Sequence, residues 1–253
     1  MSSPTGYTIK TEHLAVGYSK FPIVSDISLG MRPGELLVLI GTNGSGKSTI
    51  LKTLAGLLQP INGGLEILGA ATGSLPKRVA YLPQHPVSTH TLPLRVRDVV
   101  AMGRFTHLGL FKKLTTHDNQ IVDNSMHLTG IDSQANNPIR DLSGGQQQRT
   151  HLAQVLTRQA EVLLLDEPTA GLDINGRKLV AELIASERAR GVTVIMATHE
   201  LQDAESANTV KAIEIAKGDD TVPEAVRNAV GQKEALHLGC RCRRDRASPL
   251  VSR

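Results

Sequence analysis

The stretch GTNGSGKS, residues 41–48, constrains the fold of this chain more than any other part of its sequence. It fits the pattern G-x-x-x-x-G-K-[ST], in which glycines let backbone N–H groups turn inward around phosphate oxygens. An apolar run of strand length, LLVLI, precedes it, and TILKTLAGLL follows with helical spacing. The positive end of such a helix points at the same anion. The sequence therefore predicts a phosphate-binding loop between a buried strand and a helix.

Side chains of this loop have separate expected roles. The Lys47 ammonium would reach the β- and γ-phosphates of a nucleotide, and the Ser48 hydroxyl would coordinate Mg²⁺. A glycine-rich turn with a chance lysine is the alternative, and the complete pattern in its strand–loop–helix context argues against it. The candidate nucleotide-binding residues of the loop are Gly41, Thr42, Asn43, Gly44, Ser45, Gly46, Lys47, Ser48 and Thr49.

Strands and helices alternate over much of the chain. AEVLLLDEP and GVTVIMATHE have the pattern of buried strands, and the helical NGRKLVAELIASERAR separates them. This alternation predicts an α/β fold with a parallel sheet and helices on both faces. Near the start, TIKTEHLAVGY and PIVSDISLGM alternate like strands of an antiparallel sheet. The mostly helical stretch 86–157 would be an insertion into the core.

Two adjacent acids, Asp166 and Glu167, end the apolar run VLLL. Beside a phosphate loop, the first would hold the magnesium shell, and the second could orient and polarise an attacking water. Two acids that merely cap the next turn are the alternative. The pair predicts nucleotide hydrolysis in addition to nucleotide binding.

Another helical stretch begins with a serine and two glycines, in DLSGGQQQRTHLAQVL at residues 141–156. A helix N-terminus has free N–H groups, so Ser143, Gly144 and Gly145 would form a second anion site. A serine-capped helix whose glycines serve packing is the alternative. The chain would thus carry two phosphate-binding helix starts.

The phosphate loop, the acidic pair and LSGGQ together closely resemble the ATP-binding cassette (ABC) family, whose signature is LSGGQ. The resemblance implies a P-loop NTPase cassette over residues 1–217, with a parallel α/β core, an antiparallel β subdomain and the inserted helical subdomain. It also implies ATP and Mg²⁺ as ligands, and two subunits packed head to tail around two ATPs. The residues that would face the partner's ATP are Ser143, Gly144, Gly145 and Gln146.

Four further positions match residues of known role in that family. Tyr18, in VGYSK, matches the aromatic that stacks on adenine, although a tyrosine in a strand is common. Gln84, in YLPQHP, matches the glutamine that touches Mg²⁺ and the water and opens the coupling segment. Asp173, in AGLDI, matches the aspartate that crosses the dimer interface, and it could also cap the following helix. His199, in MATHE, matches the histidine that contacts the γ-phosphate.

The segment LPLRVRDVVAMGRFTHLGLFKKLTTHD resembles the middle of importer cassettes for metal ions such as manganese, zinc or iron, and for iron chelates or haem. This resemblance implies an integral membrane permease and, indirectly, a solute-binding protein as partners. An apolar cluster with a charged rim would form the permease-docking surface. Its residues are Leu108, Leu110, Phe111, Lys112 and Lys113. Packing inside the helical insertion is the alternative for the apolar ones.

Other cassette proteins fit less well. A double-cassette factor would need two phosphate loops, and a chromosome ATPase would need a coiled coil between phosphate loop and signature. The chain has one loop and no heptads there. An exporter ATPase and a soluble ATPase of iron–sulfur assembly, which needs no permease, remain as alternatives.

Composition and the C-terminal stretch give further expectations about partners, location and order. The formal net charge of +4 is too small and scattered to indicate nucleic acid. No apolar run approaches the roughly 18 residues of a membrane span, so we expect a cytoplasmic protein that reaches the membrane through its permease. Residues 218–253 look like a divergent, unstructured tail. Cys240 and Cys242 lack partners for a metal site, and His85 and His90 are interpreted as surface-loop residues.

Overall fold

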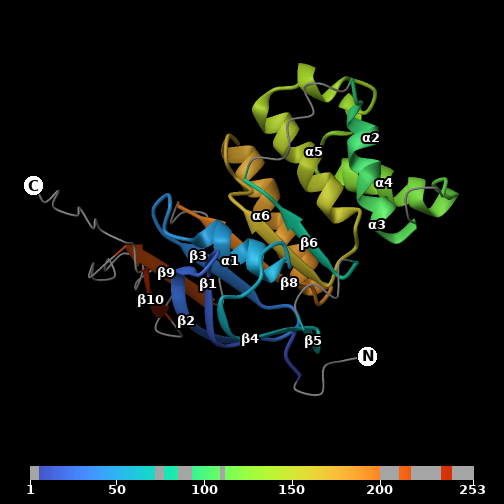
Figure 1. Ribbon diagram of the computed structural model, residues 1–253. Helices are drawn as coiled ribbons and strands as arrows, with labels where there is room; N and C mark the ends of the chain where they lie inside the picture. Colours follow the sequence, from blue (N-terminus) through green and yellow to red (C-terminus); the bar gives the residue numbers. More distant parts are fainter. Residues whose placement is uncertain are drawn as a thin grey trace, which may run out of the picture.

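One mixed sheet organises the molecule. The structure, a computed structural model, describes residues 6–71, 77–84, 93–108, 112–199, 211–217 and 235–240. Within these residues the sheet has the strand order β5-β4-β1-β2-β10-β9-β3-β8-β7-β6. Figure 1 shows the antiparallel strands at one side and the helical part at the other, with the parallel strands between them. The predicted α/β fold, with its antiparallel and helical additions, is confirmed.

The antiparallel part is built from β1 (Ile9–Tyr18), β2 (Phe21–Met31), β4 (Asn62–Ile67) and β5 (Ala70–Ala71). β1 pairs with both β2 and β4, and its pairing with β2 shifts register at bulges. Ile9 and Thr11 are buried on either side of the half-buried Lys10, but residues 14–17 are buried without a break, so the alternation expected for TIKTEHLAVGY holds only at its start. These strands form a layer beside the strand that leads into the phosphate loop.

The parallel part contains β3 (Leu36–Ile40), β6 (Val79–Leu82), β7 (Val162–Asp166), β8 (Thr193–Thr198) and β9 (Lys211–Lys217). The strands β3, β7 and β8 are buried along their whole length, which explains their unbroken apolar runs.

Strand β3 separates two apolar cores. Leu37 and Leu39 pack with α1 (Lys47–Leu54) and the antiparallel strands. Leu36, Val38 and Ile40 pack with α5 (Gly144–Leu156) and α6 (Ile174–Ala189). The split follows from the two-residue period of a strand.

The predicted helical insertion is also observed, with an apolar core of its own that includes Val99, Val122 and Ile139. Its elements are α2 (Val96–Ala101), η2 (Met102–Arg104), α3 (Phe105–Leu108), α4 (Thr116–Leu128), η3 (Asp132–Gln134) and η4 (Ile139–Asp141), followed by α5. The buried Arg104 joins three of its segments. The guanidinium donates to the Asp118 carboxylate (2.9 Å) and to the carbonyl oxygen of Thr157 (2.8 Å).

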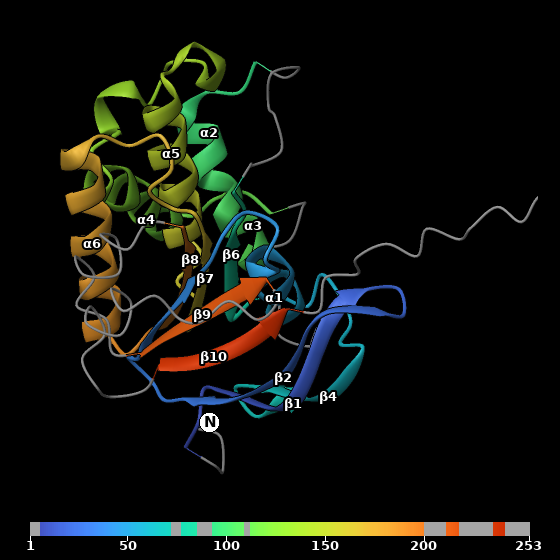
Figure 2. The same cartoon turned by 90° about the vertical axis from the view of Figure 1, so that its left-hand side faces the viewer.

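Strand β10 (Ala235–Cys240) is the main departure from the sequence analysis, because it lies in the stretch expected to be an unstructured tail. It runs parallel to β9 along six residue pairs and touches β2 where Cys240 meets Val24. Figure 2 shows β10 between β9 and β2, so this strand connects the parallel and antiparallel parts of the sheet. A strand of six residues is too short for an alternation of apolar and polar residues to be recognised beside the charged segment that follows.

Some expectations fall outside the described residues: those for His85, His90, Leu110, Phe111 and Cys242. Within the described part of the chain, no helix combines the length and apolarity needed to cross a membrane.

Candidate nucleotide-binding site

The phosphate loop follows β3 directly and leads into α1, as predicted. The Lys47 side chain is buried and folds back over the loop. Its Nζ donates to the carbonyl oxygens of Gly41 (2.7 Å) and Thr42 (3.0 Å). Burial lowers the pKa of Lys47, while the Glu167 and Asp166 carboxylates act in the opposite direction. These carbonyl contacts hold the ammonium at the place where phosphate oxygens would accept from it.

Two glycines of the loop are required by close contacts. Gly46 has φ 106°, and a Cβ there would lie 2.5 Å from Cγ2 of Val24. A Cβ on Gly41 would lie 2.5 Å from the carbonyl oxygen of Ile215. Both clashes involve residues far away in the sequence, on β2 and β9. Packing against the neighbouring strands, together with the left-handed backbone of Gly46, therefore excludes larger residues at these two positions.

Asp166 ends β7 with a buried carboxylate beside the loop. Its Oδ2 accepts a hydrogen bond from the Tyr81 hydroxyl at 3.3 Å, and among the described residues Oδ1 has no hydrogen-bond partner. Burial raises the pKa of Asp166, and hydrogen bonds with Ser48 and Tyr81 oppose that rise. A buried carboxylate oxygen without a donor, next to a serine hydroxyl, is a donor set that Mg²⁺ prefers. Ser48 and Asp166 therefore fit the magnesium role predicted for them, while Gln84, the third residue predicted to touch Mg²⁺, bonds to Glu167 through its amide nitrogen.

Tyr81 was missed by the sequence analysis, although it lies on β6 only three residues before Gln84. Burial raises the pKa of Tyr81, with further contributions from Asp166 and, last, Tyr18. The phenol therefore stays protonated and remains a hydrogen-bond donor to Asp166. Its alternating position on a strand would have suggested only packing.

Three predicted residues meet around the second acid. Oε2 of Glu167 accepts from Nε2 of Gln84 at 2.9 Å, and Oε1 lies 3.3 Å from Nδ1 of His199. Glu167 is buried and His199 is exposed. The three side chains follow β6, β7 and β8, whose carboxyl ends meet at one edge of a parallel sheet. A carboxylate between an amide and an imidazole at this edge can orient and deprotonate a water.

The LSGGQ segment forms a capped helix start. The Ser143 hydroxyl accepts from the Gln146 backbone N–H at 3.3 Å, and Oε1 of Gln146 accepts from the Ser143 N–H at 2.9 Å. Ser143 and Gly144 are exposed, and a Cβ on Gly144 would meet nothing within 4 Å. Figure 1 shows α5 in the helical part and α1 on the sheet. The capping alternative is therefore observed, but packing within this chain does not explain Gly144.

The two remaining predicted residues, Asp173 and Tyr18, lie at a helix start and a strand end. Oδ1 of Asp173 accepts from the N–H of Gly176 at 2.8 Å and caps α6, which is the alternative role that the sequence left open. Tyr18 ends β1 with 49% of its surface exposed, opposite Phe21. Its ring is therefore available to a flat apolar ligand.

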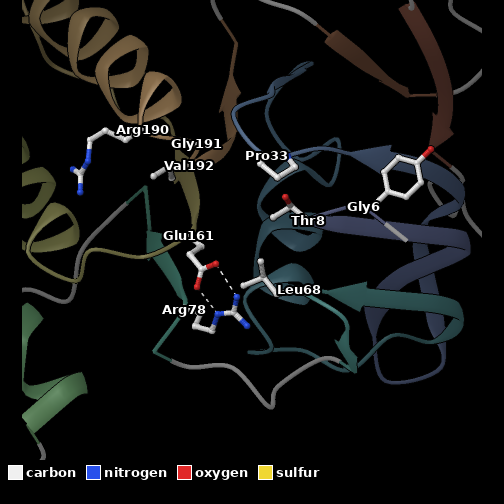
Figure 3. Close-up of a pocket in the computed structure, with 10 residues that line it drawn as sticks. Gly6, Thr8, Pro33, Leu68, Arg78, Glu161, Arg190, Gly191 and Val192 are labelled. Carbon is white, nitrogen blue, oxygen red and sulfur yellow. Dashed lines mark hydrogen bonds and ion pairs between the residues drawn. The ribbon is translucent and has the colours of Figure 1, made fainter. Parts of the chain in front are cut away.

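A separate cleft of about 370 Å³ lies away from these residues (Figure 3). Pro33, Arg78, Glu161 and Val192 line it, and each stands just before the amino end of a parallel strand. The nucleotide residues follow the carboxyl ends of these strands, so the cleft opens at the opposite edge of the sheet. Arg78 and Glu161 form an ion pair with each other there, through Nη2 and Oε2 at 2.7 Å and through a second contact.

Comparisons with known proteins agree with this geometry. The family model described as "ABC transporter" matches residues 24–170. The manganese transport system ATP-binding protein MntB of Bacillus subtilis is 36% identical, and the match covers 79% of this chain and 80% of that protein. The iron(3+)-hydroxamate import ATP-binding protein FhuC of the same organism is 36% identical, with 78% and 75% covered. The zinc transport system ATP-binding protein TroB of Treponema pallidum is 32% identical, with 79% and 75% covered.

Solved structures give the same result. A structure described as an inward-facing metal-chelate type ABC transporter matches with a TM-score of 0.71 and 28% identity, covering 83% of this chain and 80% of that one. A nucleotide-free cassette of an ABC transporter, at 17% identity and a TM-score of 0.71, shares the fold. With the phosphate loop, the acidic pair and the LSGGQ helix start all in place, this chain belongs to the ABC transporter family, as an ATP-binding and ATP-hydrolysing subunit.

Proposed function

We propose that the chain hydrolyses MgATP between two copies of itself and thereby powers import of a metal ion or an iron chelate through a separate permease. The single observation that carries the hydrolytic part is the convergence of Gln84 and His199 on the Glu167 carboxylate, beside the phosphate loop. If Glu167 served only to stabilise the fold, a buried carboxylate at that edge of the sheet would not be needed.

Each residue of the site has a proposed task. Lys47 releases its own loop carbonyls and donates to the β- and γ-phosphates, while the loop N–H groups bind the same oxygens. Ser48 and Asp166 hold Mg²⁺, which would neutralise charge that develops on the phosphates. Glu167 accepts a proton from the attacking water, Gln84 orients that water, and His199 donates toward the γ-phosphate. Tyr18 stacks on the adenine.

The partner's site is proposed to use the helix start of α5. Gly144 and Gly145 follow the exposed Ser143 with the first N–H groups of the helix, and a second copy of the chain would place its ATP there. Gln146 fixes that helix start through its hydrogen bond with Ser143, and Asp173 lies near it because Gly145 adjoins the loop before α6. Closure of the two copies completes both sites.

The proposals for the cargo and the permease rest on the similarity to ATP-binding subunits of transport systems. The names of the matched proteins include manganese, zinc and iron(3+)-hydroxamate transport, so we propose a metal ion or iron chelate as cargo. The subunit would lie peripherally on the inner face of the membrane. The exposed Lys112 and Lys113 would rim the docking surface, while Leu108 is half-buried. Failure to co-purify with any permease would favour the soluble assembly ATPase, and outward transport in vesicles would favour the exporter.

Glu167→Gln tests the hydrolytic role. The amide keeps the shape and hydrogen-bonding reach of the side chain but cannot accept the proton. We expect ATP binding to stay within about twofold and turnover to fall by about 10²- to 10⁴-fold, with accumulation of an ATP-bound dimer. Phosphate release and size-exclusion chromatography measure both. Normal turnover in this variant would move the base role to another residue, with His199 the next candidate.

A further inference from the structure

A buried glutamine in α5 contacts the backbone of the catalytic turn. Gln148 is only 7% exposed, and its Nε2 donates to the carbonyl oxygens of Pro168 (3.2 Å) and Glu167 (3.4 Å). It lies one helical turn after the start of α5, outside the LSGGQ segment. The sequence analysis assigned it no role, and a glutamine buried between two elements needs partners for its amide.

The backbone that it contacts is strained. Glu167 has φ 50°, a left-handed conformation, although it carries a side chain and precedes a proline. Residues before proline prefer extended backbone, and a left-handed φ is unfavourable for a residue that carries a side chain. Such a turn persists only when its surroundings fix it. The Glu167 N–H donates to the carbonyl of Ala197 at 2.9 Å, and its carbonyl accepts from the N–H of Ala170 at 3.1 Å.

Gln148 adds to these backbone bonds a donor from a different part of the molecule. The conformation of residue 167 decides where its carboxylate points, and Gln84 and His199 meet that carboxylate at 2.9 and 3.3 Å. The helix also adjoins this loop at a second place, because a Cβ on Gly145 would lie 3.3 Å from the carbonyl oxygen of Gly171. The helix that begins at the exposed LSGGQ segment is therefore tied to the catalytic turn of its own chain.

We propose that Gln148 is a positioning residue for Glu167, whose amide holds the strained turn at 167–168 and makes hydrolysis depend on the placement of α5. The inference rests on the proposed role of Glu167 as the base. The phosphate loop, which binds ATP in the same chain, does not depend on this amide. Loss of the amide therefore affects the chemical step and spares nucleotide affinity.

The test compares Gln148→Met with Gln147→Met in the full chain. Methionine has a similar length and no amide, and Gln147 is the matched control because its Nε2 donates to the Leu142 carbonyl (3.1 Å), within the helical part. Since a misplacement of about 1 Å can cost 10²-fold, we expect Gln148→Met to lower kcat by about 10- to 100-fold. The KM and the Kd for ATP should change less than about twofold, and Gln147→Met should keep kcat within about threefold.

A double variant separates positioning from general packing. Added to Glu167→Gln, the change at 148 should alter the remaining single-turnover rate by less than about twofold, because its target is already disabled. A further tenfold loss there, or a normal kcat in Gln148→Met, would overturn the inference while leaving the base role of Glu167 intact. Normal turnover in Glu167→Gln alone would instead overturn the proposed function. Circular dichroism checks folding, with Gln148→Leu as a second variant. If neither variant folded, the amide would be structural and the proposal wrong.

Discussion

The two helix starts that the sequence assigns to phosphate binding are built in opposite ways. Helix α1 begins after Gly46 with no side-chain cap, and its loop packs against β2 at Gly46 and against β9 at Gly41, whereas Thr42, Asn43 and Gly44 are exposed. Helix α5 begins with the Ser143–Gln146 capping box and is exposed, with open space at Gly144. The base of the first site is therefore packed by its own chain, whereas the second has only its helix and needs another molecule to cover its N–H groups.

Lys47→Ala gives the largest expected effect, because it removes a buried charged donor from the first site. We expect MgATP affinity to fall by about tenfold or more and the turnover rate to fall to the background rate of the assay. Fluorescent-nucleotide titration and phosphate release measure the two quantities. Wild-type turnover in this variant would mean that the loop lysine is not part of the active site.

Ser143→Arg should separate the two helix starts. The exposed position accepts the side chain without a clash inside the chain, but a bulky residue would block the approach of the partner's ATP. We therefore expect nucleotide binding by the monomer to stay within about threefold, and ATP-driven dimerisation and hydrolysis to be lost. Equal loss of binding in the monomer would show that LSGGQ acts within its own chain.

A matched pair of alanine substitutions sharpens the contrast. Gly46→Ala places a methyl group 2.5 Å from Val24 at φ 106°, so we expect a loss of about 1–3 kcal/mol in the free energy of unfolding. Gly144→Ala meets nothing, and alanine favours helix, so stability should rise by up to about 1 kcal/mol. Urea unfolding followed by circular dichroism measures both. Similar losses in the two variants would mean that the glycines serve the same purpose.

The start of α4 is a third helix start, and it is capped by side chains. The residues that cap it have no proposed role in nucleotide binding. Hydrogen bonds from the Thr115 hydroxyl and N–H, and then the Arg104 guanidinium, lower the pKa of Asp118 to about 2. Because the folded pKa lies below the ordinary aspartate value of 3.8, this stabilisation is complete above about pH 4 and is lost as pH falls toward 2.

The smallest expected effect therefore concerns acid stability. The melting temperature of the wild type should fall between about pH 4 and pH 2, and Asp118→Asn should show a shallower fall over that range. Differential scanning fluorimetry across that range measures it. Identical pH profiles would mean that other carboxylates dominate acid unfolding.

The sequence alone determined the chemistry-bearing segments, because each is a local pattern. The glycines and lysine of the phosphate loop, the acids after VLLL and the serine that begins α5 stand in short runs whose neighbours fix the strand or helix. The meeting of Gln84, Glu167 and His199 was also predictable, since each follows the carboxyl end of a strand of one parallel sheet.

Only the tertiary structure decided the contacts between segments far apart in the chain. Tyr81 donates to Asp166 across 85 positions, and Val24 excludes a side chain at Gly46. Strand β10 lies between β9 and β2 although its own pattern is weak. The Gln148 amide reaches the strained turn at Glu167 from another helix. Such contacts depend on how the strands and helices pack, and one sequence without its folded arrangement holds no local signal for them.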